Sequence, residues 1–87
     1  MADRRILKYE LVQQMVQTVE VPKEFRPLRF GNQGGTPTLW AEANPSGGSI
    51  QRVVFLAFTG EDVPEGKYVG TAYFGVTGEI VIHCYIK

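Results

Sequence analysis

The sequence has little of what metal-binding, disulfide-linked or membrane-spanning domains need. Its 87 residues include one cysteine, Cys84, and one histidine, His83, which excludes an internal disulfide and a cage of Cys and His metal ligands. No apolar run approaches the ~18–20 residues that span a bilayer, and residues 1–8 are too polar for a signal peptide. Nine basic and nine acidic residues leave no net charge, so binding to duplex DNA or RNA is not expected. These absences predict a small cytoplasmic domain without membrane association.

What the chain has instead is a surplus of strand-forming residues. Val, Ile, Thr, Phe, Tyr and Trp number 31 of the 87 residues, against ten Ala and Leu. Ten Gly and five Pro divide the chain into short segments. The sequence therefore predicts a single mostly-β domain over residues 1–87, an antiparallel meander of six to seven strands that forms a twisted sheet, a sandwich or a partly closed barrel. In residues 15–21 a short helix is an alternative, although three β-branched valines favour a strand.

Turn residues predict how the strands connect. Residues 5–11 and 15–21 are expected to pair as a hairpin, and so are the strands on either side of the loop at residues 45–49. Pro27 donates no ladder hydrogen bond, which predicts an edge strand or a bulge at that position. The apolar run over residues 53–58 predicts a central strand, or one whose second face meets another subunit. Since a domain of this size buries little surface, a homo-oligomer is expected.

Candidate catalytic residues are few. Two of them, His83 and Cys84, lie in the last predicted hairpin, residues 67–74 with 79–86. Because neighbours in a strand face opposite sides, His83 and Cys84 cannot form a nucleophile pair, and Cys84 is expected to be a buried hydrophobic residue. The carboxylates of the 61–65 loop share one flexible segment rather than two rigid elements, which does not suit paired acid–base catalysis. The Gly-rich stretches match no phosphate-binding loop. The sequence thus predicts no enzyme and no cofactor.

Residues suited to binding a nucleotide are spread along the chain. Arginines can clamp phosphates while an aromatic ring stacks on a base. Arg26 and Arg29, three apart in a strand, are expected to face opposite sides of their sheet. For the histidine, a hydrogen bond to a neighbouring strand is the alternative to ligand binding. The expected ligand-binding residues are Arg26 and Arg52 for phosphates, Tyr9, Trp40 and Tyr73 for stacking, Thr59 and Thr71 for hydrogen bonds, and His83 as a donor to the base edge.

Six short strings occur in order along nearly the whole chain: Arg5-Ile6-Leu7-Lys8-Tyr9, Val19-Glu20-Val21-Pro22, Pro37-Thr38-Leu39-Trp40-Ala41, Thr59-Gly60, Tyr68-Val69-Gly70-Thr71 and Ile80-Val81-Ile82-His83. In this combination the chain resembles a family of small proteins of unknown function encoded by tailed bacteriophages and prophages. It departs from that family's pattern before the histidine, where a tryptophan is common. The resemblance implies a protein that acts in the cytoplasm of a bacterial host.

Two functions follow as hypotheses. By analogy with small phage proteins that evade immunity, the first is a sponge: an oligomer that sequesters a nucleotide signal of bacterial defence, such as a cyclic dinucleotide of CBASS-type systems, at a subunit interface. The second is a protein–protein interaction module, either an inhibitor of a host defence protein or a virion accessory, that recruits a partner through exposed strand edges.

Overall fold

The computed structural model describes residues 3–87, and all of its regular structure is β-strand. This confirms the mostly-β prediction, and residues 15–21 extend as a strand rather than a helix, as their β-branched side chains favour. The strands are β1 (Arg5–Glu10), β2 (Val16–Pro22), β3 (Phe25–Gln33), β4 (Thr36–Ala43), β5 (Ser49–Phe58), β6 (Lys67–Phe74) and β7 (Ile80–Ile86).

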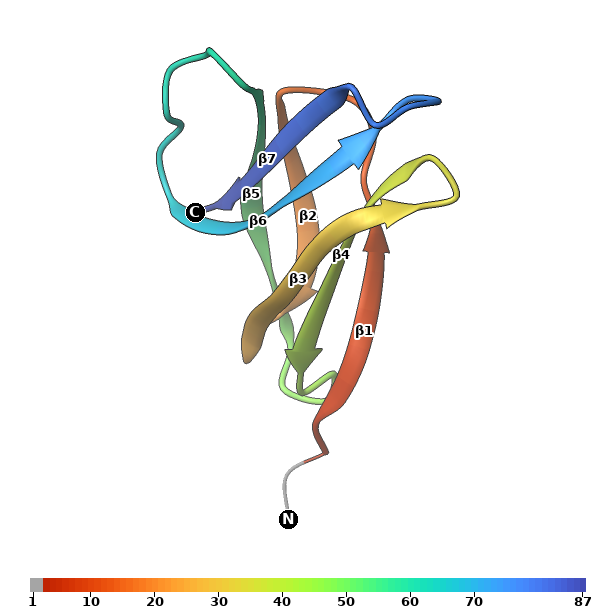
Figure 1. Ribbon diagram of the computed structural model, residues 1–87. Coiled ribbons are helices and arrows are strands. Elements are labelled where there is room, and N and C mark those ends of the chain that lie inside the picture. The colour runs from red at the N-terminus through yellow and green to blue at the C-terminus, as the bar shows by residue number, and fades with distance from the viewer. Residues whose placement is uncertain (1–2) are drawn as a thin grey trace.

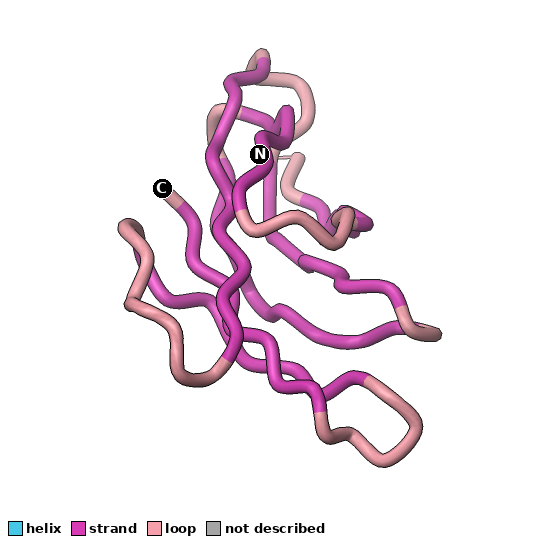
Figure 2. The backbone as a smooth tube through the Cα atoms, turned by 90° about the horizontal axis from the view of Figure 1, so that it is seen from above, coloured by secondary structure: helices cyan, strands magenta, loops and turns pink. Residues whose placement is uncertain are grey.

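The seven strands form two antiparallel sheets that pack against each other (Figure 1). One sheet has three strands in the order β1-β4-β3, and the other has four in the order β2-β5-β7-β6. Seen from above, strands joined by loops make up the whole fold (Figure 2). The architecture is a sandwich and not a closed barrel. β5 lies between β2 and β7, which confirms the prediction of a central strand.

Two of the predicted hairpins are wrong. Residues 5–11 and 15–21 do not pair with each other, because β1 pairs with β4 and β2 pairs with β5. The strands beside the 45–49 loop, β4 and β5, also belong to different sheets. Leu11 is buried in the core and its amide bonds the carbonyl of Pro37 at 2.9 Å, so the chain crosses between the sheets instead of turning back. Alternating hydrophobicity indicates which face of a strand is buried, but it does not indicate which strand pairs with it. The meander prediction paired strands that are neighbours in the sequence, and this pairing fails for β1 with β2 and for β4 with β5.

The core lies between the sheets and follows the alternation of the strands. In β7, Ile82, Cys84 and Ile86 are buried, whereas Val81, His83 and Tyr85 lie on the outer face, as predicted. The predicted hairpin of residues 67–74 with 79–86 is confirmed as β6–β7, and β3 and β4 form a further hairpin. The buried core cluster comprises Leu11, Phe30, Leu39, Val54, Leu56, Ala72, Phe74, Ile82, Cys84 and Ile86.

One side of the sandwich is closed by a contact between β3 and β6. The side-chain amide of Asn32 donates to the carbonyl of Tyr73 at 2.9 Å. At Gly70 a β-carbon would lie 3.3 Å from the amide nitrogen of Phe30, so glycine lets the two backbones approach. No helix within residues 3–87 has the length and apolar character needed to cross a membrane.

Candidate functional site

A β-bulge in β3 places two arginines on one face of the three-stranded sheet. The register of β3 against β4 shifts between Pro27 and Arg29, which confirms the bulge that Pro27 predicted. Arg26 therefore pairs with Glu42 and Arg29 with Trp40. Since Trp40 and Glu42 are two apart in β4, both arginines lie on the same outer face. The expectation that they face opposite sides is wrong, because the extra residue of the bulge reverses the alternation between them.

Trp40 lies at the centre of this face. A β-carbon at Gly31 would lie 3.3 Å from Cζ3 and 3.8 Å from Cη2 of the indole, so the benzene ring of Trp40 rests directly on the glycine backbone. The same position lies 3.5 Å from Nε of Arg29, so the guanidinium stem extends alongside the ring. Trp40 is half-buried. A side chain at this position would press on the indole, and a larger one would displace it.

Charged side chains surround the indole. Glu42 accepts hydrogen bonds from Arg26 Nη2 at 2.8 Å and from Arg4 Nε at 2.6 Å. The hydrogen bond from Arg26, followed by that from Arg4, holds the pKa of the Glu42 carboxyl below its usual value of 4.5. Lys8 reaches across β4 to donate to Oε1 of Gln33 at 2.9 Å. Arg29 makes no ion pair with any residue of the described chain.

We call this surface the Trp40 face, defined by Arg4, Lys8, Arg26, Arg29, Gly31, Trp40 and Glu42. It carries four cationic side chains and one carboxylate, with Glu10 on the same side of β1. A chain with no net charge therefore has a locally positive aromatic surface. This combination suits a ligand that has both a planar ring and phosphates.

The outer face of the four-stranded sheet is different in chemistry. The Oγ1 atom of Thr71 lies 2.5 Å from the hydroxyl of Tyr68 and 2.9 Å from Nδ1 of His83, and Nε2 of His83 lies 2.9 Å from Oγ1 of Thr59. Both ring nitrogens of His83 are thus occupied by threonine hydroxyls. The histidine is hydrogen-bonded to its neighbours, which is the alternative to ligand binding, and it lines a surface pocket together with Glu61 and Asp62 of the loop after β5. This arrangement fixes the orientation of the ring.

We call this second surface the His83 face, defined by Phe55, Ala57, Tyr68, Thr71, Tyr73, Val81, His83 and Tyr85. None of these side chains carries a fixed charge, and Tyr68 and Tyr73 are 57% and 63% exposed. The rings of Tyr68 and Tyr85 pack edge to face with centroids 5.5 Å apart. Aromatic residues without charge are typical of the centre of a protein interface, and this face offers no cation to a phosphate.

Comparison with known proteins assigns the chain to a family. Residues 2–87 match the family described as Domain of unknown function (DUF7352). The chain belongs to this family. No curated protein and no solved structure matches it.

Tyr9 and Arg52, two of the residues expected to bind ligand, lie at a third place. Both contact Phe25 between the sheets: the rings of Tyr9 and Phe25 have centroids 5.7 Å apart, and Cζ of Arg52 lies 5.8 Å from the Phe25 centroid. Arg52 also donates from Nε to the carbonyl of Lys87 at 2.8 Å. Burial raises the pKa of Tyr9. Tyr9 and Arg52 therefore pack on Phe25 of β3, and Arg52 also bonds the C-terminal residue.

The eight predicted residues are therefore distributed over three places. Arg26 and Trp40 share the Trp40 face; Thr71, Tyr73 and His83 share the His83 face, with Thr59 bonded to His83 at its edge; and Tyr9 and Arg52 pack on Phe25. Sequence reasoning missed Arg4, Lys8 and Arg29 as members of a common surface. The bulge predicted at Pro27 could have indicated the position of Arg29. The positions of Arg4 and Lys8 depend on the pairing of β1 with β4, for which the sequence contains no signal. Within residues 3–87, no group of three or more His, Cys, Asp or Glu side chains could hold a metal ion.

Proposed function

We propose that this chain is a non-catalytic binding protein that captures a nucleotide on the Trp40 face. The observation that carries the proposal is the position of the Trp40 indole, which rests on Gly31 between the strands that bear Arg26, Arg29 and Lys8. A base that stacks on an aromatic side chain gains about 1–3 kcal/mol. The adjacent cations lie where the phosphates of the stacked nucleotide would extend.

The cations on this face would contribute unequally. Arg29 has no carboxylate partner, so its planar fork is available for bidentate hydrogen bonds to a phosphate. Arg26 and Arg4 share Glu42, which neutralises part of their charge. Lys8 is held by a neutral amide and can exchange that partner for an anion. Arg29 and Lys8 are thus the first contacts that an incoming phosphate would make.

The proposal includes a biological role. By analogy with small phage proteins that evade immunity, the ligand would be a cyclic nucleotide signal of a bacterial defence system, and the protein would act by holding the signal without converting it. The bonding of His83 supports this reading, because the one histidine is fixed between two hydroxyls, away from the cations. The carboxylate on the Trp40 face, Glu42, is paired with two guanidinium groups, so this surface would withdraw a messenger by affinity alone.

Self-association is part of the same proposal. The His83 face is uncharged and aromatic, so two copies could meet there without bringing like charges together. Each assembly would then carry more than one Trp40 face. The same chemistry favours a second candidate function, in which the His83 face binds a host protein and the chain is an interaction module.

Trp40 provides a direct test because it is the only tryptophan in the chain. Purified protein would be titrated with cyclic mononucleotides, cyclic dinucleotides and ADP-ribose derivatives while indole fluorescence is recorded. We expect quenching by one class of ligand and recovery of intact ligand after denaturation. At about 100 times Kd, the same ligand should stabilise the folded state by about 2.7 kcal/mol.

Two matched variants show where binding occurs. Arg29→Gln should weaken binding by about tenfold, as expected for a lost charge-assisted hydrogen bond. Lys67→Gln removes the same charge from β6, away from the Trp40 face, and should leave Kd unchanged. Equal losses in both variants, or no quenching with any ligand, would overturn the proposal. Stoichiometric capture of a host protein that Tyr73→Lys prevents would support the second candidate instead.

A further inference from the structure

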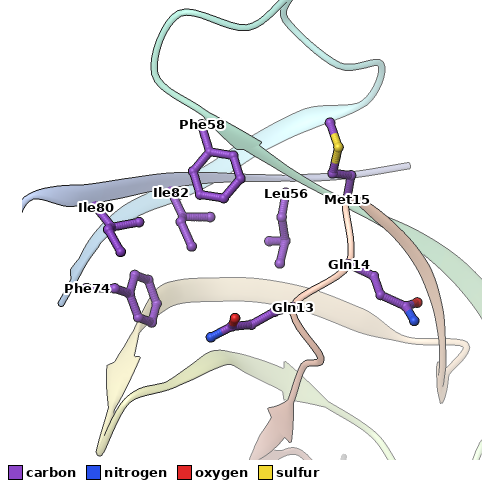
Figure 3. A pocket seen from close by; sticks show the side chains of 8 residues that line it. All are labelled: Gln13, Gln14, Met15, Leu56, Phe58, Phe74, Ile80 and Ile82. Carbon is purple, nitrogen blue, oxygen red and sulfur yellow. The ribbon is translucent and has the colours of Figure 1, made fainter.

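A cavity opens at one end of the sandwich, away from both faces described above. Figure 3 shows it between the inner side of the four-stranded sheet and the chain that crosses from β1 to β2. Its volume is about 180 Å³. The lining side chains are Gln13, Gln14, Met15, Leu56, Phe58, Phe74, Ile80 and Ile82.

The crossing segment keeps this cavity open. The side chain of Gln17 bonds the amide of Val12 at 3.1 Å and the carbonyls of Val12 and Gln14 at 2.8 and 3.1 Å. The amide of Leu56 also donates to the carbonyl of Met15 at 2.9 Å. These bonds hold the crossing segment in place at the start of β2 and against β5. The cavity is therefore part of the folded state.

The cavity is apolar and its mouth is unusually hydrophobic for a protein surface. Met15, Phe58 and Ile80 remain 54%, 48% and 42% exposed where the cavity opens. No charged side chain lines it. The polar side chains are the two glutamines, and in Figure 3 the carboxamide of Gln13 extends beneath the apolar groups toward Phe74, while that of Gln14 points away. The exposed Gln13 thus brings one neutral hydrogen-bonding group alongside the apolar side chains.

We propose that this cavity binds a small neutral aromatic compound that carries one hydrogen-bonding group, as in a phenol or an indole. The size fits, because an engineered apolar protein cavity of about 150 Å³ is known to bind benzene. Phe58 and Phe74 offer edge-to-face contacts to a ring, and the thioether of Met15 offers a sulfur–aromatic contact. The Gln13 carboxamide both donates and accepts, so it can pair with a hydroxyl or a ring N–H.

Methyl NMR on the full chain tests the proposal with three probes: phenol, indole and benzene. We expect shifts confined to the methyl groups of Met15, Leu56, Ile80 and Ile82, with phenol binding several-fold more tightly than benzene. Gln13→Met keeps the side-chain length without the amide, and should abolish the preference for phenol while benzene still binds. These results would show both the place of binding and the role of the polar group.

Two charged variants at the mouth provide the control. Ile80→Lys should weaken phenol binding by at least tenfold, because the ammonium would be brought against a ring-sized apolar space. Met15→Lys serves the same purpose if Ile80→Lys fails to fold. Ile6→Lys introduces the same charge at a residue that is 71% exposed on the other sheet, and should bind phenol normally. Absence of methyl shifts at millimolar probe, or shifts that survive in both mouth variants, would overturn the proposal and leave the nucleotide proposal untouched.

Discussion

Gly31 shows how one residue can determine a surface without contacting a ligand. Its φ is not positive, so the backbone itself does not require glycine, but a β-carbon would press on the Trp40 ring at 3.3 Å. Gly31→Val should therefore displace the indole, shift its fluorescence emission to longer wavelength and weaken nucleotide binding by about tenfold or more. Gly47→Val is the matched control, since Gly47 also lacks a positive φ and a β-carbon there would meet only the carbonyl oxygen of Asn44 at an ordinary 3.9 Å. Unchanged emission and affinity in Gly31→Val would mean that the ring does not need its glycine support.

Glu42 is expected to limit anion binding on the same face. Its lowered pKa keeps the carboxylate charged throughout the neutral range, so it holds Arg26 and Arg4 at all pH values near 7. Glu42→Gln should release both guanidinium groups and raise nucleotide affinity by roughly three- to tenfold, measured by titration of Trp40 fluorescence. Glu65→Gln breaks the Glu65–Lys87 ion pair elsewhere and should have no effect. A lower affinity in Glu42→Gln would show that Glu42 positions the arginines instead of masking them.

The thiol of Cys84 should make stability sensitive to alkali. Burial raises its pKa from the usual 9.0 to about 12 in the folded chain. In the unfolded chain the thiol ionises near pH 9, so its contribution to stability is complete below that pH and is lost as the pH rises toward 12. The loss is about 1.4 kcal/mol per pH unit in this window. Denaturant unfolding of Cys84→Ala should show a shallower decline between pH 9 and 11 than the parent chain, and equal slopes would contradict the argument.

At the scale of elements, the start of β6 depends on a glycine that has two separate roles. Gly66 has φ +97°, and a β-carbon there would lie 2.5 Å from the carbonyl oxygen of Ile86. Gly60 has φ +100° but open space around it. Gly60→Ala should therefore cost only the strain of the left-handed backbone, about 1–2 kcal/mol, whereas Gly66→Ala adds a backbone clash and should cost clearly more. Urea unfolding of the two variants measures the difference, and equal losses would show that the Gly66 contact relaxes freely.

The elements themselves were largely predictable, and their partners were not. The alternation in β7 correctly assigned Cys84 to the core and His83 to the outside, and Pro27 correctly indicated a bulge. Both are local effects, read from a few neighbouring residues. The crossing at Leu11 is not local, because a leucine that ends one strand looks the same whether the chain turns back or passes to the other sheet. The Trp40 face depends on that crossing, since it combines Lys8 of β1, Trp40 of β4 and Arg29 of β3. For that reason the sequence identified Arg26 and Trp40 individually but could not assemble the surface.

At the scale of the whole molecule, a net charge of zero conceals a separation of charge. Cations gather on the outer face of the three-stranded sheet, while three carboxylates lie in the loop at residues 61–65, between β5 and β6 of the other sheet. The equal numbers of basic and acidic residues show that the chain as a whole is not basic. They could not indicate that four cationic side chains lie on one sheet while the other sheet carries the uncharged, aromatic His83 face. In the proposed function, the three-stranded sheet binds the ligand and the four-stranded sheet binds a second copy of the chain.

That division predicts the behaviour of the chain in solution. If copies meet through the His83 face, light scattering after size-exclusion chromatography should give a mass of at least twice that of one chain, falling on dilution. Tyr73→Lys places a charge at a residue that is 63% exposed on that face, and should yield monomers without loss of folding. Its nucleotide affinity per chain should be unchanged, because the Trp40 face lies on the other sheet. Ile6→Lys should remain oligomeric. A parent chain that is monomeric at hundreds of micromolar would remove self-association from the proposal, and a Tyr73→Lys variant that stays oligomeric would move the interface to another face.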